Sequence, residues 1–200
     1  LYERGVRNEA LYDTILDNTR FIDDLQGDID AFVNATKIGV ARVQELCERY
    51  GVAAIAQTFD GLLDRCAKTL LETVLPMIPD GTYDFEDFCE YDGVQPRESL
   101  KYIRLKATMT KSPEGINFDF TGTSRQIQGS LNWPANGRYY AKSLGTLFLA
   151  FAPDMIINDG VNRVIDCTLP EKTVLSPEWP AACSWRTFPL LRILDVGLGI

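Results

Sequence analysis

Apolar side chains recur along the first part of the chain at the three- and four-residue spacing of a helix. One stripe lies in residues 29–50 and a second in residues 55–74, so each would line one face of a helix. Gly51 is a C-terminal stop for the first helix, and Pro76 ends the second. Because the turn between them is so short, we expect an antiparallel helical hairpin. A shorter helix is expected over residues 9–18.

After Pro79 the pattern changes to the two-residue alternation of strands. Residues 83–88 and 101–109 alternate, and residues 118–121 follow a Ser-Pro-Glu-Gly turn, which predicts a β-hairpin. A run of helices followed by a run of strands favours the α+β class. We therefore expect a helical region over residues 1–78 and a β-rich α+β region over residues 79–200, together forming one continuous domain.

The second region contains further elements beside its antiparallel or mixed sheet. Residues 139–151 are apolar without alternation, which predicts a buried helix that Pro153 ends. A short strand is expected over residues 161–167 and a helix over 186–197. The sequence lacks an initiator Met and stops in mid-pattern at Ile200, so we expect a fragment of a larger chain, truncated at both ends.

Composition narrows the function classes. The net charge of −8 disfavours a nucleic-acid binder, and no apolar run of membrane-spanning length is present. The five cysteines form no CxxC pair and are expected to be buried free thiols in a cytoplasmic protein. The chain has no histidine, which excludes a Ser-His-Asp triad and a His-based metal site within it. A magnesium or calcium site made of carboxylates alone stays possible.

Acidic residues gather in two places. Six of them lie between residues 80 and 92, and in a strand Asp84 and Glu86 would share one face while Asp87 faces the other. These acids are interpreted either as a cation site or, with more weight, as a solvated edge strand. A second cluster, residues 23–30, suits the positive end of the long helix.

The strongest candidate site is the segment Phe-Asp-Phe-Thr-Gly-Thr-Ser-Arg-Gln-Ile-Gln-Gly-Ser-Leu-Asn-Trp-Pro-Ala at residues 118–135. A strand there runs into a polar loop with two glycines, and loops set on a rigid strand often form binding sites. The alternative is a solvated turn between strands. As a site, it would use Asp119 as a base or orienting group and the Thr, Gln and Asn side chains to hold carboxylate or amide oxygens. Arg125 or Arg138 would pair with an anionic intermediate. The expected substrate-binding residues are Thr121, Gly122, Thr123, Gln126, Gln128, Asn132 and Arg138.

Three motifs carry a resemblance to a known family. They are the segment above, Pro-Asp-Gly-Thr-Tyr-Asp-Phe-Glu-Asp at residues 79–87, and Ser-Pro-Glu-Trp-Pro-Ala-Ala at residues 176–182. Together they resemble the hydantoinase B / 5-oxoprolinase family. The sequence around Trp133-Pro134 and Trp179-Pro180 is most similar to that of the large subunits of ATP-dependent acetone and acetophenone carboxylases. Both tryptophans are expected to be buried, unless they wall a pocket.

The resemblance implies a hetero-oligomer in which ATP is bound by a hydantoinase A-type partner, since this chain has no phosphate-binding loop. It implies foremost the carboxylation of a ketone with bicarbonate. The alternatives are ATP-dependent hydrolysis of a cyclic amide, or a non-catalytic scaffold that docks the ATP-using partner. Any metal ion would come from residues outside this chain, because the His ligands that the resemblance implies are missing here.

Overall fold

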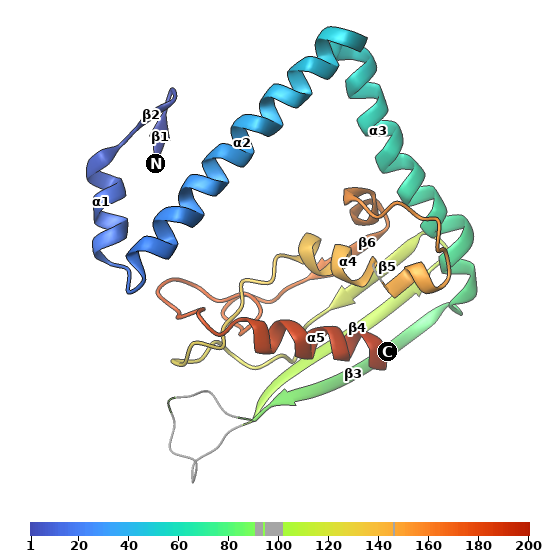
Figure 1. Cartoon of the computed structure of the whole chain (residues 1–200). Coiled ribbons are helices and arrows are strands. Elements are labelled where there is room, and N and C mark those ends of the chain that lie inside the picture. The colour runs from blue at the N-terminus through green and yellow to red at the C-terminus, as the bar shows by residue number, and fades with distance from the viewer. Residues whose placement is uncertain (91–93, 95–101, 146) are drawn as a thin grey trace. The chain divides into compact units, whose positions relative to one another are not determined.

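The computed structural model describes residues 1–90, 94, 102–145 and 147–200, and its contacts divide the chain into two compact units. Unit 1 is Leu1–Thr58 and unit 2 is Phe59–Ile200, so the boundary falls inside helix α3 (Val52–Thr69) (Figure 1). The division at residue 78 that we expected marks instead the change from helix to strand, and as a domain boundary it stays a prediction.

Unit 1 is mostly helical. A pair of two-residue strands, β1 (Tyr2–Glu3) and β2 (Val6–Arg7), precedes α1 (Glu9–Asp17) and α2 (Ile22–Tyr50). The Asn8 side chain caps α1 by accepting the N–H of Leu11. Acids in the first turn of α2 and Arg49 in its last turn both suit the helix dipole. The predicted helices are therefore confirmed, and α2 begins seven residues earlier than its apolar stripe.

The two long helices joined by a short turn are found as expected, but the apolar stripe of α2 is not buried. Gly51 separates α2 from α3 with a positive φ of 84°, as predicted for a helix stop, but no residue of α2 is buried. Phe32, Val40 and Val43 on its apolar stripe are all exposed. Spacing alone shows which residues share a helix face, whereas burial depends on what packs against that face.

In unit 2, α3 leads into the core through a π-helical turn at Leu70–Val74 and a 3₁₀ turn at Leu75–Met77. Leu70, Val74 and Leu75 are almost completely buried there. Pro76 lies inside the 3₁₀ turn, where a missing N–H and a fixed φ are tolerated, so the helix ends where the sequence predicts.

The core of unit 2 is a four-stranded sheet with the order β3-β4-β5-β6. The strands are β3 (Gly81–Cys89), β4 (Ile103–Ser112), β5 (Gly115–Asp119) and β6 (Ile165–Thr168). The first three are antiparallel and β6 runs parallel to β5, which confirms a mixed sheet and the predicted hairpin at Ser112. The fold is thus α+β, as expected from the order of the elements.

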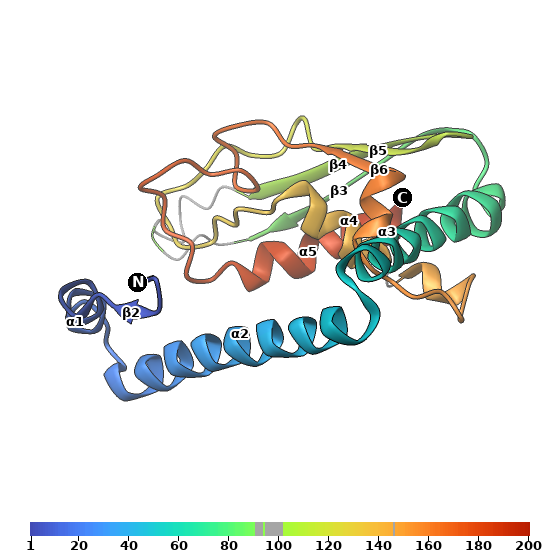
Figure 2. The ribbon, with the colours of Figure 1, turned by 90° about the horizontal axis from the view of Figure 1, so that it is seen from above.

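Alternation along β4 decides which face of the sheet is covered. Ile103, Leu105, Ala107 and Met109 are buried, and the helices α4 (Gly137–Gly145) and α5 (Thr187–Gly199) lie over that face (Figure 2). The opposite face carries polar residues, with Glu86 opposite Lys106 across the β3–β4 pair. The separation of Glu86 from Asp87 by the pleat is confirmed, because Asp87 is registered with the buried Leu105.

Two predicted elements differ in extent. The apolar stretch from residue 139 yields α4 and a separate 3₁₀ turn at Leu147–Ala150, of which Tyr140, Leu144 and Phe148 are buried. The strand expected from residue 161 begins only at Ile165, after a 3₁₀ turn at Asp159–Arg163. Asn158 starts that turn by accepting the N–H of Gly160, a local hydrogen bond that competes with strand formation.

Candidate functional site

Asp119, the predicted catalytic residue, is the last residue of β5 and lies opposite Thr108 on the polar face of the sheet. Its Oδ1 accepts the N–H of Thr121 at 2.8 Å, which turns the chain out of the strand. Gly122 follows with φ +98°, and its carbonyl accepts a 2.7 Å hydrogen bond from Nε of Arg104. Thr121 is exposed beside this turn. Asp119, Thr121 and Gly122 therefore lie together on the polar face.

The side chain of Thr123 bonds to the backbone of β4, at a place where β5 has already ended. Its buried hydroxyl accepts the N–H of Lys106 and donates to the carbonyl of the same residue, both at 3.1 Å. Ser124 acts similarly, since its Oγ accepts the N–H of Arg104 at 2.9 Å. These hydroxyls satisfy backbone groups of β4 beyond the end of β5.

Asn132 is fully buried, and its side-chain amide lies within hydrogen-bond distance of four backbone groups. Its Oδ1 accepts the N–H of Ile127, and the two N–H groups of its Nδ2 are shared among the carbonyls of Ile127, Gly129 and Ala182, at 2.9–3.0 Å. A primary amide can fill such a site because it offers donors and an acceptor at once. Asn132 thus ties its own loop to a segment fifty residues away.

The other predicted binding residues are spread around this loop. Oε1 of Gln126 accepts the N–H of Glu178 at 2.8 Å, whereas Gln128 is exposed. Arg138 belongs to α4, but its side chain lies outside what the structure describes. Their assignment to substrate binding stays a prediction, as does that of Asp119. The side-chain polar groups of Thr123, Asn132 and Gln126 form hydrogen bonds to backbone groups of this chain.

Backbone hydrogen bonds join the two loops along their length. The N–H groups of Gln126, Trp133 and Trp185 donate to the carbonyls of Lys172, Val174 and Ser130 at 2.7–2.9 Å. We call residues 124–135 and 172–185 together the double strap. It holds Ser130 and Leu131, from the predicted site, against the start of α5.

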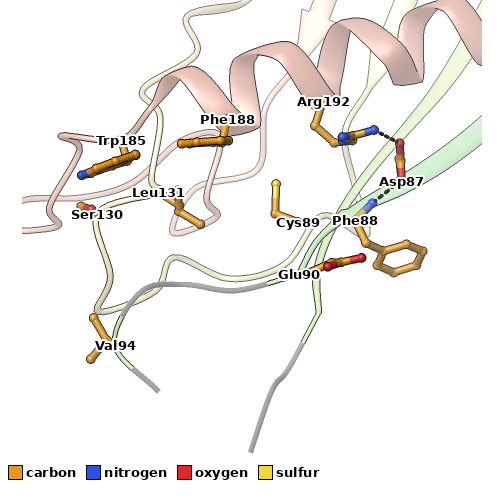
Figure 3. Close-up of a pocket in the computed structure, with 10 residues that line it drawn as sticks. All are labelled: Asp87, Phe88, Cys89, Glu90, Val94, Ser130, Leu131, Trp185, Phe188 and Arg192. Carbon is orange, nitrogen blue, oxygen red and sulfur yellow. Dashed lines mark hydrogen bonds and ion pairs between the residues drawn. The ribbon is translucent and has the colours of Figure 1, made fainter. Parts of the chain in front are cut away.

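A cavity of about 790 Å³ opens beside the double strap, on the helix-covered side of the sheet (Figure 3). Its walls come from the end of β3, the strap and α5. The lining residues are Asp87, Phe88, Cys89, Glu90, Val94, Ser130, Leu131, Trp185, Phe188 and Arg192. A concave space with an apolar wall and a few polar groups is the usual form of a small-molecule site. We take this cavity as the candidate functional site.

An ion pair forms the polar part of the cavity wall. Arg192 Nη1 lies 2.9 Å from Asp87 Oδ2 and 3.2 Å from Asp195 Oδ2. Burial acts to raise the pKa of Asp87, but the N–H of Phe88 and the guanidinium of Arg192 outweigh it and lower the pKa below its usual value. Burial raises the pKa of the neighbouring Cys89 thiol despite the positive charge of Arg192. Near neutral pH the wall therefore presents a carboxylate, a guanidinium and a neutral thiol.

An aromatic pair forms the apolar part of the cavity wall. The rings of Trp185 and Phe188 stack with centroids 5.5 Å apart and an interplanar angle of 16°. Both rings are more than half exposed, at 59% and 52%. Leu131, which is nearly buried, adjoins them in the cavity (Figure 3).

The tryptophans of the family motifs have different surroundings from each other. Trp133 is buried, as expected, and its ring meets that of Tyr139 edge-on. Burial of Trp179 is wrong: this side chain is 93% exposed, and neither residue lines the cavity. Glu178 next to it is held by Gln126 and Lys172, so the segment is fixed by polar contacts while the indole projects from it.

Sequence reasoning missed the residues of the cavity wall as a group, although signals for them were present. The predicted helix over 186–197 places Phe188 and Arg192 four residues apart, on one face. Alternation in β3 places Asp87 on the side opposite Glu86. These two faces meet through a tertiary contact. Neither the helical periodicity nor the alternation of the strand predicts such a contact.

The described residues lack two kinds of feature. They contain no group of three or more Cys, Asp or Glu side chains arranged to hold a metal ion. Nor does any helix among them combine the length and the apolar composition needed to cross a membrane. All five cysteines are free, and of these only Cys66 is fully buried in the structure.

Comparison with known proteins places the chain in a family. Residues 1–200, the whole sequence, match the family described as Hydantoinase B/oxoprolinase. The chain belongs to this family. Its whole length is covered by the match, which confirms the resemblance carried by the three motifs.

Individual relatives agree with this assignment. The chain is 28% identical over 189 residues to the B-type component assigned to a D-/L-hydantoinase of a Pseudomonas species, covering 90% of this chain and 31% of that protein. In fold it is similar to the ATP-dependent caprolactamase of Pseudomonas jessenii, with a TM-score of 0.77 over 98% of this chain and 34% of that one, at 21% identity.

A second solved structure is more distant. It is an acetone carboxylase described as carrying out ATP-dependent acetone carboxylation, with a TM-score of 0.60 and 17% identity over 73% of this chain and 20% of that one. The chain thus spans about a third of the length of the hydantoinase component and of the caprolactamase to which it is similar. It corresponds to one part of a larger architecture.

Proposed function

We propose that this chain is part of the B-type subunit of an ATP-dependent enzyme that opens a cyclic amide. The observation that carries the proposal is the match of the entire chain to a family described by hydantoinase B and oxoprolinase. Hydantoin, oxoproline and caprolactam, which the names of the family and its relatives specify, differ in ring size but share an amide bond inside a ring.

In the proposed reaction, ATP bound by a hydantoinase A-type partner activates the ring carbonyl. Water adds to that carbon, the C–N bond breaks, and the ring nitrogen takes up a proton. Ring opening consumes one water, and splitting ATP to ADP and phosphate consumes a second. Asp119 stays a predicted catalytic residue, but it lies on the polar face of the sheet, whereas the cavity opens on the helix-covered face and Asp119 does not line it. For ring opening in the cavity we therefore assign Asp119 no step.

The second candidate is ATP-dependent carboxylation of a ketone with bicarbonate. It is supported by the sequences Asn132-Trp133-Pro134 and Glu178-Trp179-Pro180, and the similarity in fold to acetone carboxylase is compatible with it. It ranks second because the family description and the hydantoinase relative, which covers most of this chain, both name cyclic amides.

The test is an assay of the full-length subunit purified with its natural partner. ATP is supplied with hydantoin, 5-oxoproline or caprolactam in one series, and with ketones and labelled bicarbonate in the other. ADP release coupled to ring opening, absent from either subunit alone, is the expected result. Label fixed in an acid-stable product would establish the carboxylase instead, and activity in neither series would favour a scaffold role. An Asp119→Asn variant that still assembles with the partner but loses ring opening would place the reaction on the polar face of the sheet rather than in the cavity.

A further inference from the structure

Building on the proposed function, we infer that the cavity selects cyclic amides that carry a large aromatic or apolar substituent, which packs on the stacked Trp185–Phe188 pair while the ring amide faces the Asp87–Arg192 pair. The apolar part of the cavity wall supports the preference for the substituent, and the polar part supports the placement of the ring amide. Figure 3 shows Phe188 and Arg192 on α5, with Trp185 just before the helix and Asp87 facing Arg192 from β3.

The apolar half argues for the substituent. Trp185 and Phe188 already stack on each other in a near-parallel arrangement, yet more than half of each side chain is exposed. A third flat ring can extend such a stack and remove apolar surface from water. Leu131 closes the same wall from the strap, so a substituent would contact all three side chains. The cavity's volume of about 790 Å³ admits a ligand much larger than a bare five-membered ring.

The polar half argues for a neutral amide. Asp87 and Arg192 lie side by side at 2.9 Å, so their charges largely cancel toward an incoming ligand. Within a small ring, the amide N–H and C=O point to the same side. A carboxylate that accepts beside a guanidinium that donates matches that pair of groups. A strongly anionic ligand is disfavoured, because Glu90 and Asp87 both line the cavity.

The first experiment uses calorimetry to measure how the full-length subunit associates with two probes, hydantoin and 5-benzylhydantoin. We expect 5-benzylhydantoin to bind at least about tenfold more tightly, as a well-packed apolar group is worth one to two orders of magnitude. Trp185→Leu should remove most of that difference and leave the affinity for hydantoin nearly unchanged. Equal affinities in the unaltered protein, or a difference that survives Trp185→Leu, would overturn the inference.

Trp179→Leu is the matched control, because it removes a tryptophan that is 93% exposed and does not line the cavity. It should leave both affinities unchanged. Phe188→Leu provides a second cavity variant, and urea midpoints for all three show whether each remains folded. Should Trp185→Leu fail to fold, Phe188→Leu decides the outcome by the same criterion.

Turnover by the complex with its partner separates the two proposals. Preferential binding of 5-benzylhydantoin without any ATP-dependent ring opening would refute the proposed function and leave the aromatic site standing. Ring opening with equal kcat/KM for the two probes would support the function and refute the selectivity.

Discussion

Replacing Asn132 by alanine should loosen the double strap. The substitution removes one accepted hydrogen bond and the two N–H donors that three carbonyls share, in a site that is fully buried. A buried hydrogen bond contributes about 1 kcal/mol net, so the loss of these three bonds would cost about 3 kcal/mol. We expect a loss of about 3 kcal/mol, a substantial share of the roughly 5–15 kcal/mol that stabilises a typical domain.

Urea unfolding followed by tryptophan fluorescence measures this loss. All three tryptophans lie in unit 2, so the signal reports the unit that contains the strap. Gln126→Ala is the control: it removes a single side-chain hydrogen bond between the two segments of the strap, from a half-buried side chain, and should cost about 1 kcal/mol or less. If Asn132→Ala destabilised unit 2 no more than Gln126→Ala does, the view of Asn132 as the connection between the two loops would be refuted.

Three further predictions concern other parts of the chain. Lys111 is only 7% exposed and pairs with Asp80 at 2.5 Å, so Asp80→Ala should cost about 3 kcal/mol by stranding a buried charge, whereas Lys111→Met should be nearly neutral in the same urea assay. Gly160→Ala should destabilise by more than about 2 kcal/mol, because a Cβ there would collide with the backbone carbonyl of Leu63 in α3, while Gly39→Ala in the exposed middle of α2 should stabilise by about 0.5–1 kcal/mol in thermal melts. Burial raises the pKa of Cys167 to about 12, so at pH 8 its thiol stays protonated and should resist iodoacetamide until the protein unfolds, which peptide mass mapping can follow; rapid labelling of the folded protein would contradict this.

Local patterns in the sequence predicted the elements of the fold well. The alternation of Ile103, Leu105 and Ala107 identified both a strand and its buried face, because residues two apart on a strand point to the same side. The apolar stripe, which begins at residue 29, does not reach the start of α2 at Ile22, and it was the acidic cluster at residues 23–30 that indicated a helix start there. Such acids stabilise a helix start through the dipole, which periodicity does not measure.

The candidate site was predicted less completely, and the reason is long-range contact. The polar loop was recognised by its composition, but composition could not tell that the amide of Asn132 bonds to Ala182. The same limitation applies to Trp179 and Trp185, which lie six residues apart in one segment. Trp185 faces the cavity and Trp179 projects into solvent, and the difference follows from where α5 begins rather than from the residue type.

The double strap also has a consequence for the order in which unit 2 acquires its structure. Strands β3, β4 and β5 pair with their neighbours in sequence, so that meander can form early. The strap instead joins residues about fifty positions apart, a loop whose closure costs entropy before its contacts are made. The cavity wall at Ser130 and Leu131 is therefore expected to be completed late. A chain damaged at Asn132 would keep its sheet and lack a finished cavity, so intact secondary structure in such a variant would be no guide to its capacity to bind a ligand.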